Sequence, residues 1–213
     1  MRFWRFVCNP YAENTYLIAA GREAWLIDPG FYTHSEKQHF LEVLEREGLE
    51  LRAIYLTHAH IDHVLGVRWV VERFGVPLYY HAAEEVVYRH AGEWAMMMGL
   101  QYEEGPEATA YVEEGELVWG SDLLVQVRHV PGHSPGSVAY YFPKAERVFS
   151  GDVLFAAGIG NYHLPLADYE TLMRSIVEKL LPLGEVVEVW PGHGPSTTIG
   201  TEKVSNPFLK DAI

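Results

Sequence analysis

The stretch Thr57-His58-Ala59-His60-Ile61-Asp62-His63 decides how the rest of the chain is interpreted, because four side chains that can bind a cation fall within six residues. The residues before it, 51–56, are apolar and favour a strand. The residues after it, 64–74, place apolar side chains at helical spacing. The pattern therefore predicts a strand, a polar loop and a helix. In open α/β sheets, ligands bind beyond the carboxyl ends of the strands, where such loops lie.

The spacing of the three histidines favours a binding loop. His58, His60 and His63 would not share one face of a regular helix, where neighbours are three or four residues apart. A loop can turn them to common points, and neutral imidazole with carboxylate suits zinc and iron. The alternative is an exposed polar turn in which the histidines occur by chance.

Three candidates further along the chain argue against that alternative. Each follows a strand-like run and adjoins a glycine, which lets the backbone bring one side chain to a fixed point. They are His133 in Pro131-Gly132-His133, Asp152 after Ser150-Gly151, and His193 in Pro191-Gly192-His193. Together with the first stretch they predict a metal site built from loops in both halves of the chain.

The bulk properties exclude several classes of protein. The 213 residues carry a formal net charge of −13, which disfavours nucleic acid and anionic membranes as partners. No stretch approaches the ~18 apolar residues of a membrane span, and the first apolar run breaks at Asn9-Pro10, unlike a signal peptide. Cys8 is the only cysteine, so no internal disulfide or cysteine metal cluster is expected. We expect a cytoplasmic protein. The composition does not indicate an oligomeric state.

The remaining pattern predicts alternating strands and helices without a repeat or linker, and therefore one domain over residues 1–213. The expected helices are 35–47 (with Ser35 as N-cap and Gly48 as C-cap), 64–74, 83–98 and 168–181. The expected strands are 2–8, 13–20, 23–28, 51–56, 76–80, 109–112, 116–119, 122–130, 137–142, 147–150 and 186–190. Met96, Met97 and Met98 are expected in the core, with a wall of the substrate cleft as the alternative. Asp28 is expected to form a turn, or alternatively to orient a metal-bound histidine. Two sheets packed together with helices outside would bury both sheets.

The motifs resemble the metallo-β-lactamase superfamily over essentially the whole chain. The resemblance is carried by His58-x-His60-x-Asp62-His63, then His133, Asp152 and His193. It is closest to short bacterial proteins of the hydroxyacylglutathione hydrolase (glyoxalase II) branch, through Leu26-Ile27-Asp28-Pro29-Gly30 and Asn206-Pro207-Phe208-Leu209 among others. It implies an α/β fold arranged as a four-layer αββα sandwich.

The resemblance also implies a dinuclear metal hydrolase. One ion would be bound by His58, His60 and His133, the second by Asp62, His63 and His193, and Asp152 would bridge them. The ions would be divalent, zinc first, with iron and manganese as alternatives. Asp62 and Asp152 are the carboxylates to which catalysis is assigned. A hydroxide bridging the ions would cleave S-lactoylglutathione or a similar small acyl thioester.

Substrate contacts are expected from the loop after Asp152. Relatives that bind glutathione carry a basic and an aromatic residue there, whereas this chain has Asn161, Tyr162 and His163. Alternative functions remain open at this point. One is a persulfide dioxygenase with one iron held by residues matching His58, His133 and Asp152. The others are a lactonase-like hydrolase and a metal-binding protein without catalysis.

Overall fold

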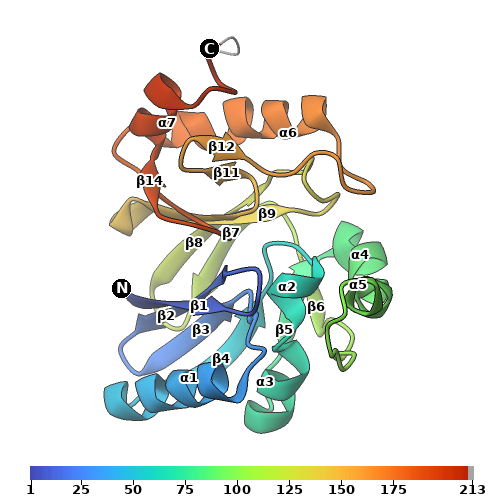
Figure 1. The fold of residues 1–213 in the computed structure, drawn as a ribbon. Coiled ribbons are helices and arrows are strands. Elements are labelled where there is room, and N and C mark those ends of the chain that lie inside the picture. Colours follow the sequence, from blue (N-terminus) through green and yellow to red (C-terminus); the bar gives the residue numbers. More distant parts are fainter. Residues whose placement is uncertain (211–213) are drawn as a thin grey trace. The chain divides into compact units, whose positions relative to one another are not determined.

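The structure is a computed structural model in which residues 1–210 are described. The chain forms two compact units, Met1–Val112 (unit 1) and Glu113–Ile213 (unit 2). Each has its own sheet and its own cluster of buried apolar side chains. Figure 1 labels the elements of both units. The expectation of a single domain over residues 1–213 stays a prediction.

Unit 1 contains a mixed six-stranded sheet whose strands lie in chain order. The first three strands pair antiparallel, and the third to sixth pair parallel. The parallel part aligns the carboxyl ends of the third and fourth strands, where the ligand-rich loop begins. The strands are β1 (Arg2–Cys8), β2 (Glu13–Ala20), β3 (Glu23–Ile27), β4 (Glu50–Tyr55), β5 (Leu78–His81) and β6 (Ala110–Val112).

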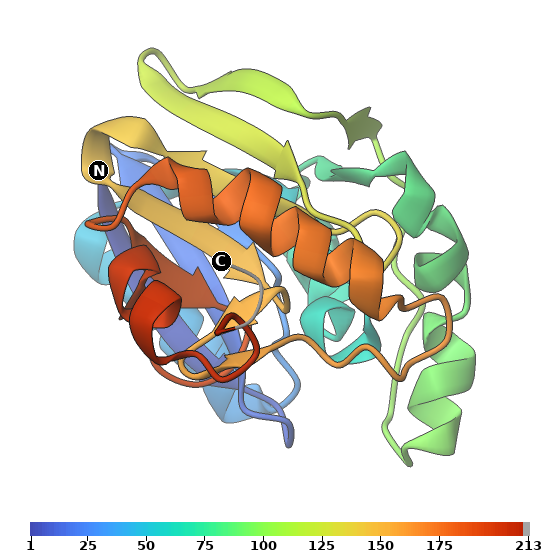
Figure 2. The ribbon, with the colours of Figure 1, turned by 90° about the horizontal axis from the view of Figure 1, so that it is seen from above.

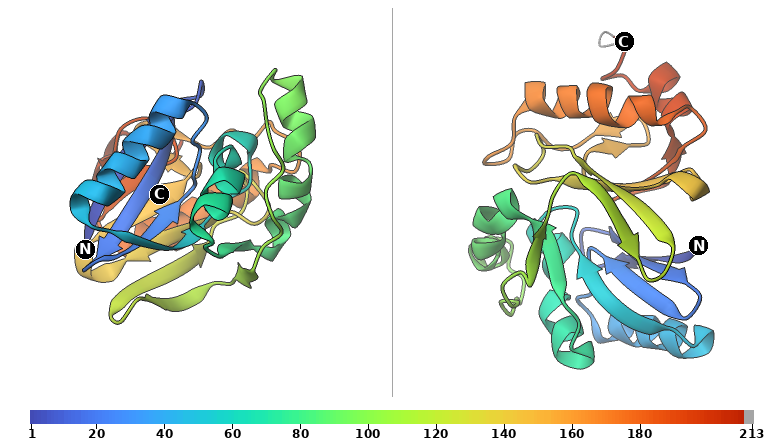
Figure 3. Two further views of the ribbon diagram at one scale, coloured as in Figure 1. Left: turned by 90° about the horizontal axis from the view of Figure 1, so that it is seen from below. Right: turned by 180° about the vertical axis from the view of Figure 1, so that it is seen from behind.

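Two helices cover one face of this sheet, as the left view of Figure 3 shows: α1 (His34–Glu47) and α3 (Val67–Phe74). Phe40 and Val43 of α1 and Val70 of α3 are buried in the same apolar cluster. The expected N-cap Ser35 is wrong. Thr33 caps α1, because its hydroxyl accepts from the Glu36 amide while the Glu36 carboxylate accepts from the Thr33 amide. Gly48 is the C-cap, as predicted.

The helix predicted over 64–74 is two helices, α2 (Ile61–Val64) and α3, separated at Gly66. The Gly66 amide donates to the Pro29 carbonyl over 2.8 Å, and a Cβ on Gly66 would lie 2.8 Å from that oxygen. A side chain at this position would therefore push the ligand-bearing α2 away from the end of β3.

The helix predicted over 83–98 is likewise divided. A 3₁₀ turn (Ala82–Glu84) precedes α4 (Glu85–Arg89) and α5 (Ala91–Met97), which meet at His90. Ala91 and Ala95 of α5 are buried, and α5 contacts α2. Met96, Met97 and Met98 are 76%, 73% and 43% exposed, so their expected place in the core is wrong.

Unit 2 contains a second six-stranded sheet. Its order is β14 (Thr197–Thr198), β13 (Glu188–Pro191), β10 (Arg147–Gly151), β9 (Val138–Phe142), β8 (Leu123–His129) and β7 (Gly115–Trp119). Only β10 and β13 pair parallel. A 3₁₀ turn (Pro143–Ala145) links β9 to β10, and a small hairpin, β11 (Leu154–Phe155) and β12 (Gly158–Ile159), follows β10.

Two helices pack on one face of the second sheet, as Figure 2 shows from above: α6 (Tyr169–Ser175) and α7 (Ile199–Ser205). The helix predicted over 168–181 begins as α6, continues as a π-helical turn (Ile176–Leu180) and ends in a 3₁₀ turn (Leu181–Leu183). Leu172, Ile176 and Leu180 are buried with Ile199 of α7. The sequence analysis did not predict α7 or β14. Among residues 1–210, no helix is long and apolar enough to cross a membrane.

Candidate metal centre

The first group of predicted ligands lies in unit 1, where the neighbouring parallel strands β3 and β4 end. Asp28 follows β3 with a left-handed backbone (φ 49°), a conformation that aspartate tolerates better than most residues. Its Oδ1 accepts from the Thr57 amide over 2.6 Å, and its Oδ2 accepts from the Thr57 hydroxyl over 2.5 Å. The Asp28 amide donates to the Tyr55 carbonyl. The Asp28 carboxylate thus fixes the start of the ligand-rich loop.

The same carboxylate determines which ring nitrogen carries the proton in two histidines. Because the Thr57 hydroxyl donates to Asp28, its oxygen accepts from Nδ1 of His58, 3.0 Å away. Nδ1 of His63 donates to Asp28 Oδ2 over 3.0 Å. A neutral imidazole has one proton, so in both rings Nε2 carries a lone pair. Asp28 therefore takes the alternative role predicted for it and orients histidines of the candidate site.

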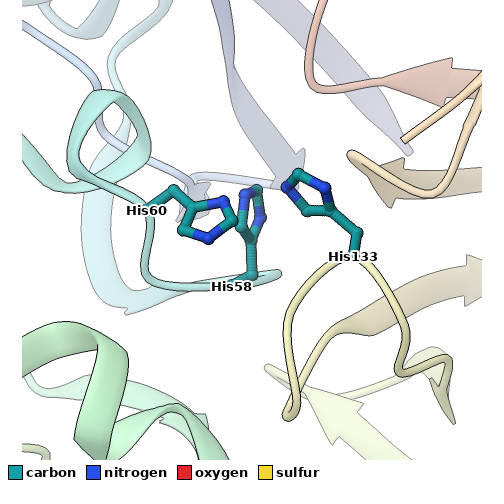
Figure 4. Close-up of side chains that lie close together, drawn as sticks. All are labelled: His58, His60 and His133. Carbon is teal, nitrogen blue, oxygen red and sulfur yellow. The ribbon is translucent and has the colours of Figure 1, made fainter. Parts of the chain in front are cut away.

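The four predicted ligands of unit 1 lie close together. The ring centroid of His58 is 4.1 Å from that of His63 and 4.8 Å from that of His60. Asp62 Oδ2 is 3.7 Å from His63 Nε2. Figure 4 shows that His58 and His60 come from the loop that leads into α2, whereas His133 comes from the turn after β8.

Further polar side chains that the sequence analysis missed hold this loop in place. The Glu84 carboxylate accepts from the Ala59 amide over 2.8 Å, between the first two histidines. The Asn9 carboxamide donates to the carbonyls of Asp62 and Gly30. Asn9 and Glu84 are polar residues next to the ends of a predicted strand and a predicted helix. Only that position could have indicated their role from the sequence.

Glu13 is a fully buried carboxyl group on β2, beside this loop. Burial raises the pKa of Glu13 well above its usual range, against the opposing effect of His63. Thr15 Oγ1 lies 2.8 Å from both Glu13 Oε2 and the Asp28 carbonyl. The Thr15 hydroxyl donates to one or the other of these two oxygens, while its own oxygen accepts from the Gly30 amide over 2.9 Å. Burial therefore favours the uncharged form of this carboxyl group.

The second group of predicted ligands lies in unit 2 and meets at Asp152. His133 follows β8, Asp152 follows β10 and His193 follows β13. Asp152 Oδ2 is 3.7 Å from His133 Nε2 and 3.5 Å from His193 Nε2. Beside the parallel pair β10–β13, the Gly192 amide donates to the Gly151 carbonyl over 2.9 Å, which brings Asp152 and His193 together.

The loop after Asp152 orients His133. The Asn161 carbonyl accepts from His133 Nδ1 over 3.0 Å, so His133 also presents the lone pair of Nε2. Gly160 permits this approach, because a Cβ there would collide with the Asp152 carbonyl and lie 3.1 Å from Cβ of His133. The Asn161 side chain accepts from the His163 amide, and the Tyr162 ring packs on His163 and Tyr169. Contact of Asn161, Tyr162 or His163 with substrate stays a prediction.

The donor set in each unit fits divalent metal ions. Neutral imidazoles with an oriented Nε2 lone pair and adjacent carboxylates are the ligands that zinc, iron and manganese accept. Asp28 lies within 4.8 Å of ring nitrogens of His58 and His63, but its oxygens already accept from Thr57 and from His63 Nδ1, so its role is to orient these rings. Cys8 does not belong to the set, because it is buried and burial raises the pKa of its thiol.

Comparison with known families agrees with this donor chemistry. The sequence model described as the metallo-beta-lactamase superfamily matches residues 8–195. The chain belongs to the metallo-β-lactamase superfamily. The predicted fold class, α/β with the metallo-β-lactamase fold, is confirmed.

The chain is similar to the following three proteins. A hydroxyacylglutathione hydrolase, GloC of Haemophilus influenzae, is 36% identical over 195 residues, which covers 88% of each chain. The crystal structure of the BLEG-1 B3 metallo-β-lactamase is 38% identical with a TM-score of 0.89, covering 98% of this chain and 100% of the other. The structure of TTHA1623 in a di-iron-bound form is 42% identical with a TM-score of 0.87, covering 97% and 100%. The protein is thus a metallo-hydrolase of the superfamily.

Proposed function

We propose that the protein is a dinuclear metal-dependent thioesterase that cleaves S-lactoylglutathione or a similar small acyl thioester. In this proposal His58, His60 and His133 would hold one ion, Asp62, His63 and His193 would hold the second, and Asp152 would be shared by both. The observation that carries it is the orientation of three ligand histidines, since His58, His63 and His133 each donate their Nδ1 proton to a fixed acceptor. The hydroxyacylglutathione hydrolase relative supports the choice of thioesters.

The chain's own residues prepare the ligand set before any substrate binds. Two divalent ions held there would lower the pKa of a bound water toward neutrality and would polarise the substrate carbonyl. Asp62 and Asp152 offset the positive charge and keep their carboxylates beside His63 and His193. Asp28 and the Asn161 carbonyl hold the ring orientation of the histidines, which maintains ligand basicity.

A thioester suits a site without a strong general acid. A thiol has a pKa of ~8.5, so it leaves without protonation. Ser150 adjoins the ligands but is buried, and its hydroxyl donates to the carbonyls of Gly151 and Leu154. It therefore shapes the turn before Asp152 and is unsuited to act as a nucleophile.

The loop geometry favours a site that does not depend on glutathione. Asn161 stands where glutathione-binding relatives carry a basic residue, and its side chain is used within its own loop. We therefore expect similar kcat/KM values for S-lactoylglutathione and for the lactoyl thioester of the much smaller N-acetylcysteamine.

The test is hydrolysis of both lactoyl thioesters by protein reconstituted separately with zinc, iron and manganese. Asp62→Ala should lower kcat/KM by about 100-fold or more, because a carboxylate ligand is lost. Asp122→Ala removes an exposed carboxylate in the β7–β8 turn and should leave activity unchanged. A fully metal-loaded protein that leaves both thioesters intact would reject the thioesterase proposal.

Two other activities are tested with the same preparations. Oxygen uptake with glutathione persulfide by the iron form would indicate a persulfide dioxygenase, in which His58, His133 and Asp152 hold one iron. Turnover of a lactone or a β-lactam without thioester turnover would indicate another hydrolase, and the B3 β-lactamase relative supplies the reason to include β-lactams. In each case the partner is a small molecule.

A further inference from the structure

Unit 1 contains a pocket that none of the predicted metal ligands lines. It has a volume of about 250 Å³ and lies between α4 and the segment before β6. Its walls are formed by Tyr80, Glu85, Tyr88, Arg89, Glu104, Gly105 and Glu107. It therefore calls for an explanation separate from the metal chemistry.

The charged groups of this pocket leave an excess of negative charge. Three carboxylates face one guanidinium, and Arg89 is already paired with Glu85 over 2.6 Å and lies 3.8 Å from Glu107. Glu85 also accepts from the hydroxyls of Tyr80 and Tyr111, over 2.7 and 3.1 Å. Glu85 and Glu107 thus offset the single positive charge of the arginine, and Glu104 adds a further negative charge to the wall.

Tyr88 supplies an independent indication of a ligand. Its side chain is only 5% exposed, and its hydroxyl has no hydrogen-bond partner among residues 1–210. Buried hydroxyls are normally satisfied, so one that is not calls for a partner. The hydroxyl lies against Gly105 in the pocket wall, where a Cβ would collide with it. The absence of a side chain at Gly105 therefore gives this oxygen its position.

The aromatic rings complete the description of the pocket. The ring centroids of Tyr80 and Tyr88 are 5.1 Å apart, and the rings are tilted by 36°. Aromatic faces attract cations through the ring quadrupole, and an ammonium group supplies N–H donors for oxygen acceptors. Tyrosine rings, carboxylates and a hydroxyl oxygen in one small pocket are a combination that recognises such a group.

We propose that this pocket binds a small primary ammonium ion. The ammonium group donates to Tyr88 Oη and to the Glu104 carboxylate, and its alkyl part lies against the tyrosine rings. The inference concerns unit 1 alone and is independent of the metal content and of the reaction. Failure of the thioesterase proposal would leave it intact, and the reverse also holds.

The test is isothermal titration of the full-length protein with butylammonium chloride in phosphate buffer, because Tris and other amine buffers would compete. 1-Butanol and sodium butyrate serve as the neutral and anionic analogues. We expect saturable one-site binding of butylammonium and at least about tenfold weaker binding of both analogues, a ratio that corresponds to ~1.4 kcal/mol. Equal affinity for butanol, or no saturable binding of butylammonium, would overturn the proposal.

Two variants locate the binding site. Tyr88→Phe removes a hydroxyl that has no hydrogen-bond partner among residues 1–210, so it should fold normally, and Gly105→Ala displaces that hydroxyl. Each should weaken butylammonium binding by about tenfold, again ~1.4 kcal/mol. Gly92→Ala is the matched control, because a Cβ there meets only Tyr102 at 3.9 Å. Unchanged affinity in Tyr88→Phe, with its fold verified by circular dichroism, would contradict the assignment.

Discussion

Asp28 Oδ2 accepts a hydrogen bond from Nδ1 of His63 over 3.0 Å, and the same oxygen accepts the Thr57 hydroxyl that in turn accepts from His58. One buried carboxylate thereby sets the protonation of two rings that we assign to different ions. Its influence on the metal site should exceed that of an ordinary turn residue.

Asp28→Asn is predicted to weaken metal binding by roughly 10–100-fold, the usual effect of losing a group that orients a ligand. Asparagine tolerates the left-handed backbone of residue 28, so the fold should persist. Its Nδ2 donates, so His63 Nδ1 must accept and the ring proton moves to Nε2. Competition with a metal indicator gives the affinity, and ¹⁵N chemical shifts of the imidazoles of the metal-free protein report the tautomer.

The control for this prediction is Asp122→Asn, an exposed aspartate in a turn. It should change neither metal affinity nor the imidazole spectrum. A metal affinity for Asp28→Asn equal to that of the wild type would show that Asp28 serves the turn alone.

Gly160→Ala is predicted to lower metal affinity and destabilise the protein by about 1–3 kcal/mol, the usual cost of overpacking. The added methyl group would collide with the Asp152 carbonyl and displace the loop that holds His133. Gly158→Ala is the matched control, because its methyl group would meet only Phe155, at 3.8 Å. Thermal unfolding and metal stoichiometry are to be measured for both variants. Equal melting temperatures and equal stoichiometries for Gly160→Ala and Gly158→Ala would contradict the prediction.

Glu13→Gln is predicted to stabilise the protein relative to the wild type by an amount that grows as the pH increases. Burial raises the folded-state pKa of Glu13 above its unfolded value of 4.5. The stability that this carboxyl contributes is therefore complete below pH 4.5 and is lost as pH rises toward the folded pKa. Glutamine has nearly the same shape and does not ionise. The difference in melting temperature between variant and wild type, both metal-free, should grow from pH 4.5 to 8, and a constant difference would contradict a raised pKa of Glu13.

Asn161→Lys is predicted to lower KM for S-lactoylglutathione and to leave KM for the N-acetylcysteamine thioester unchanged. Only glutathione carries carboxylates that a lysine can bind, and an exposed ion pair contributes up to ~1 kcal/mol, about fivefold. Metal content should be unaffected, because His133 is held by the backbone carbonyl of residue 161. Equal changes in KM for both substrates would assign this loop another role.

The sequence predicted most strands and the superfamily, because ligand spacing and alternating apolar residues are local signals. Helix continuity was predicted poorly. The break at Gly66 depends on the distant Pro29 carbonyl, and the π-helical turn after Ser175 leaves no mark in the apolar spacing. Short β14 and α7 fall in a polar stretch whose only buried apolar anchor is Ile199.

Site residues divide in the same way. The predicted ligands stand in recognisable motifs, whereas Thr57, Glu84 and the Asn161 carbonyl act through contacts between distant segments. The place of Asn161 in its loop predicts a substrate contact. Its contact with His133 is made by the backbone carbonyl, which every residue type has, so the sequence could not indicate it. The exposure of Met96 and Met97 follows from the turn of α5 that buries Ala91 and Ala95. A cytoplasmic location and the absence of a nucleic-acid partner stay predictions.

The parallel pairing of β10 with β13 also has a consequence for the order of folding events. The predicted ligands of unit 1 come from one short stretch, but Asp152 and His193 become neighbours only when strands separated by a hairpin, a helix and two helical turns pair. Long-range parallel pairing is slow because loop closure must precede its contacts. We expect metal ions added during refolding to leave the rate of the early folding phase unchanged. They should bind and stabilise the chain only in the last phase, after β10 and β13 have paired.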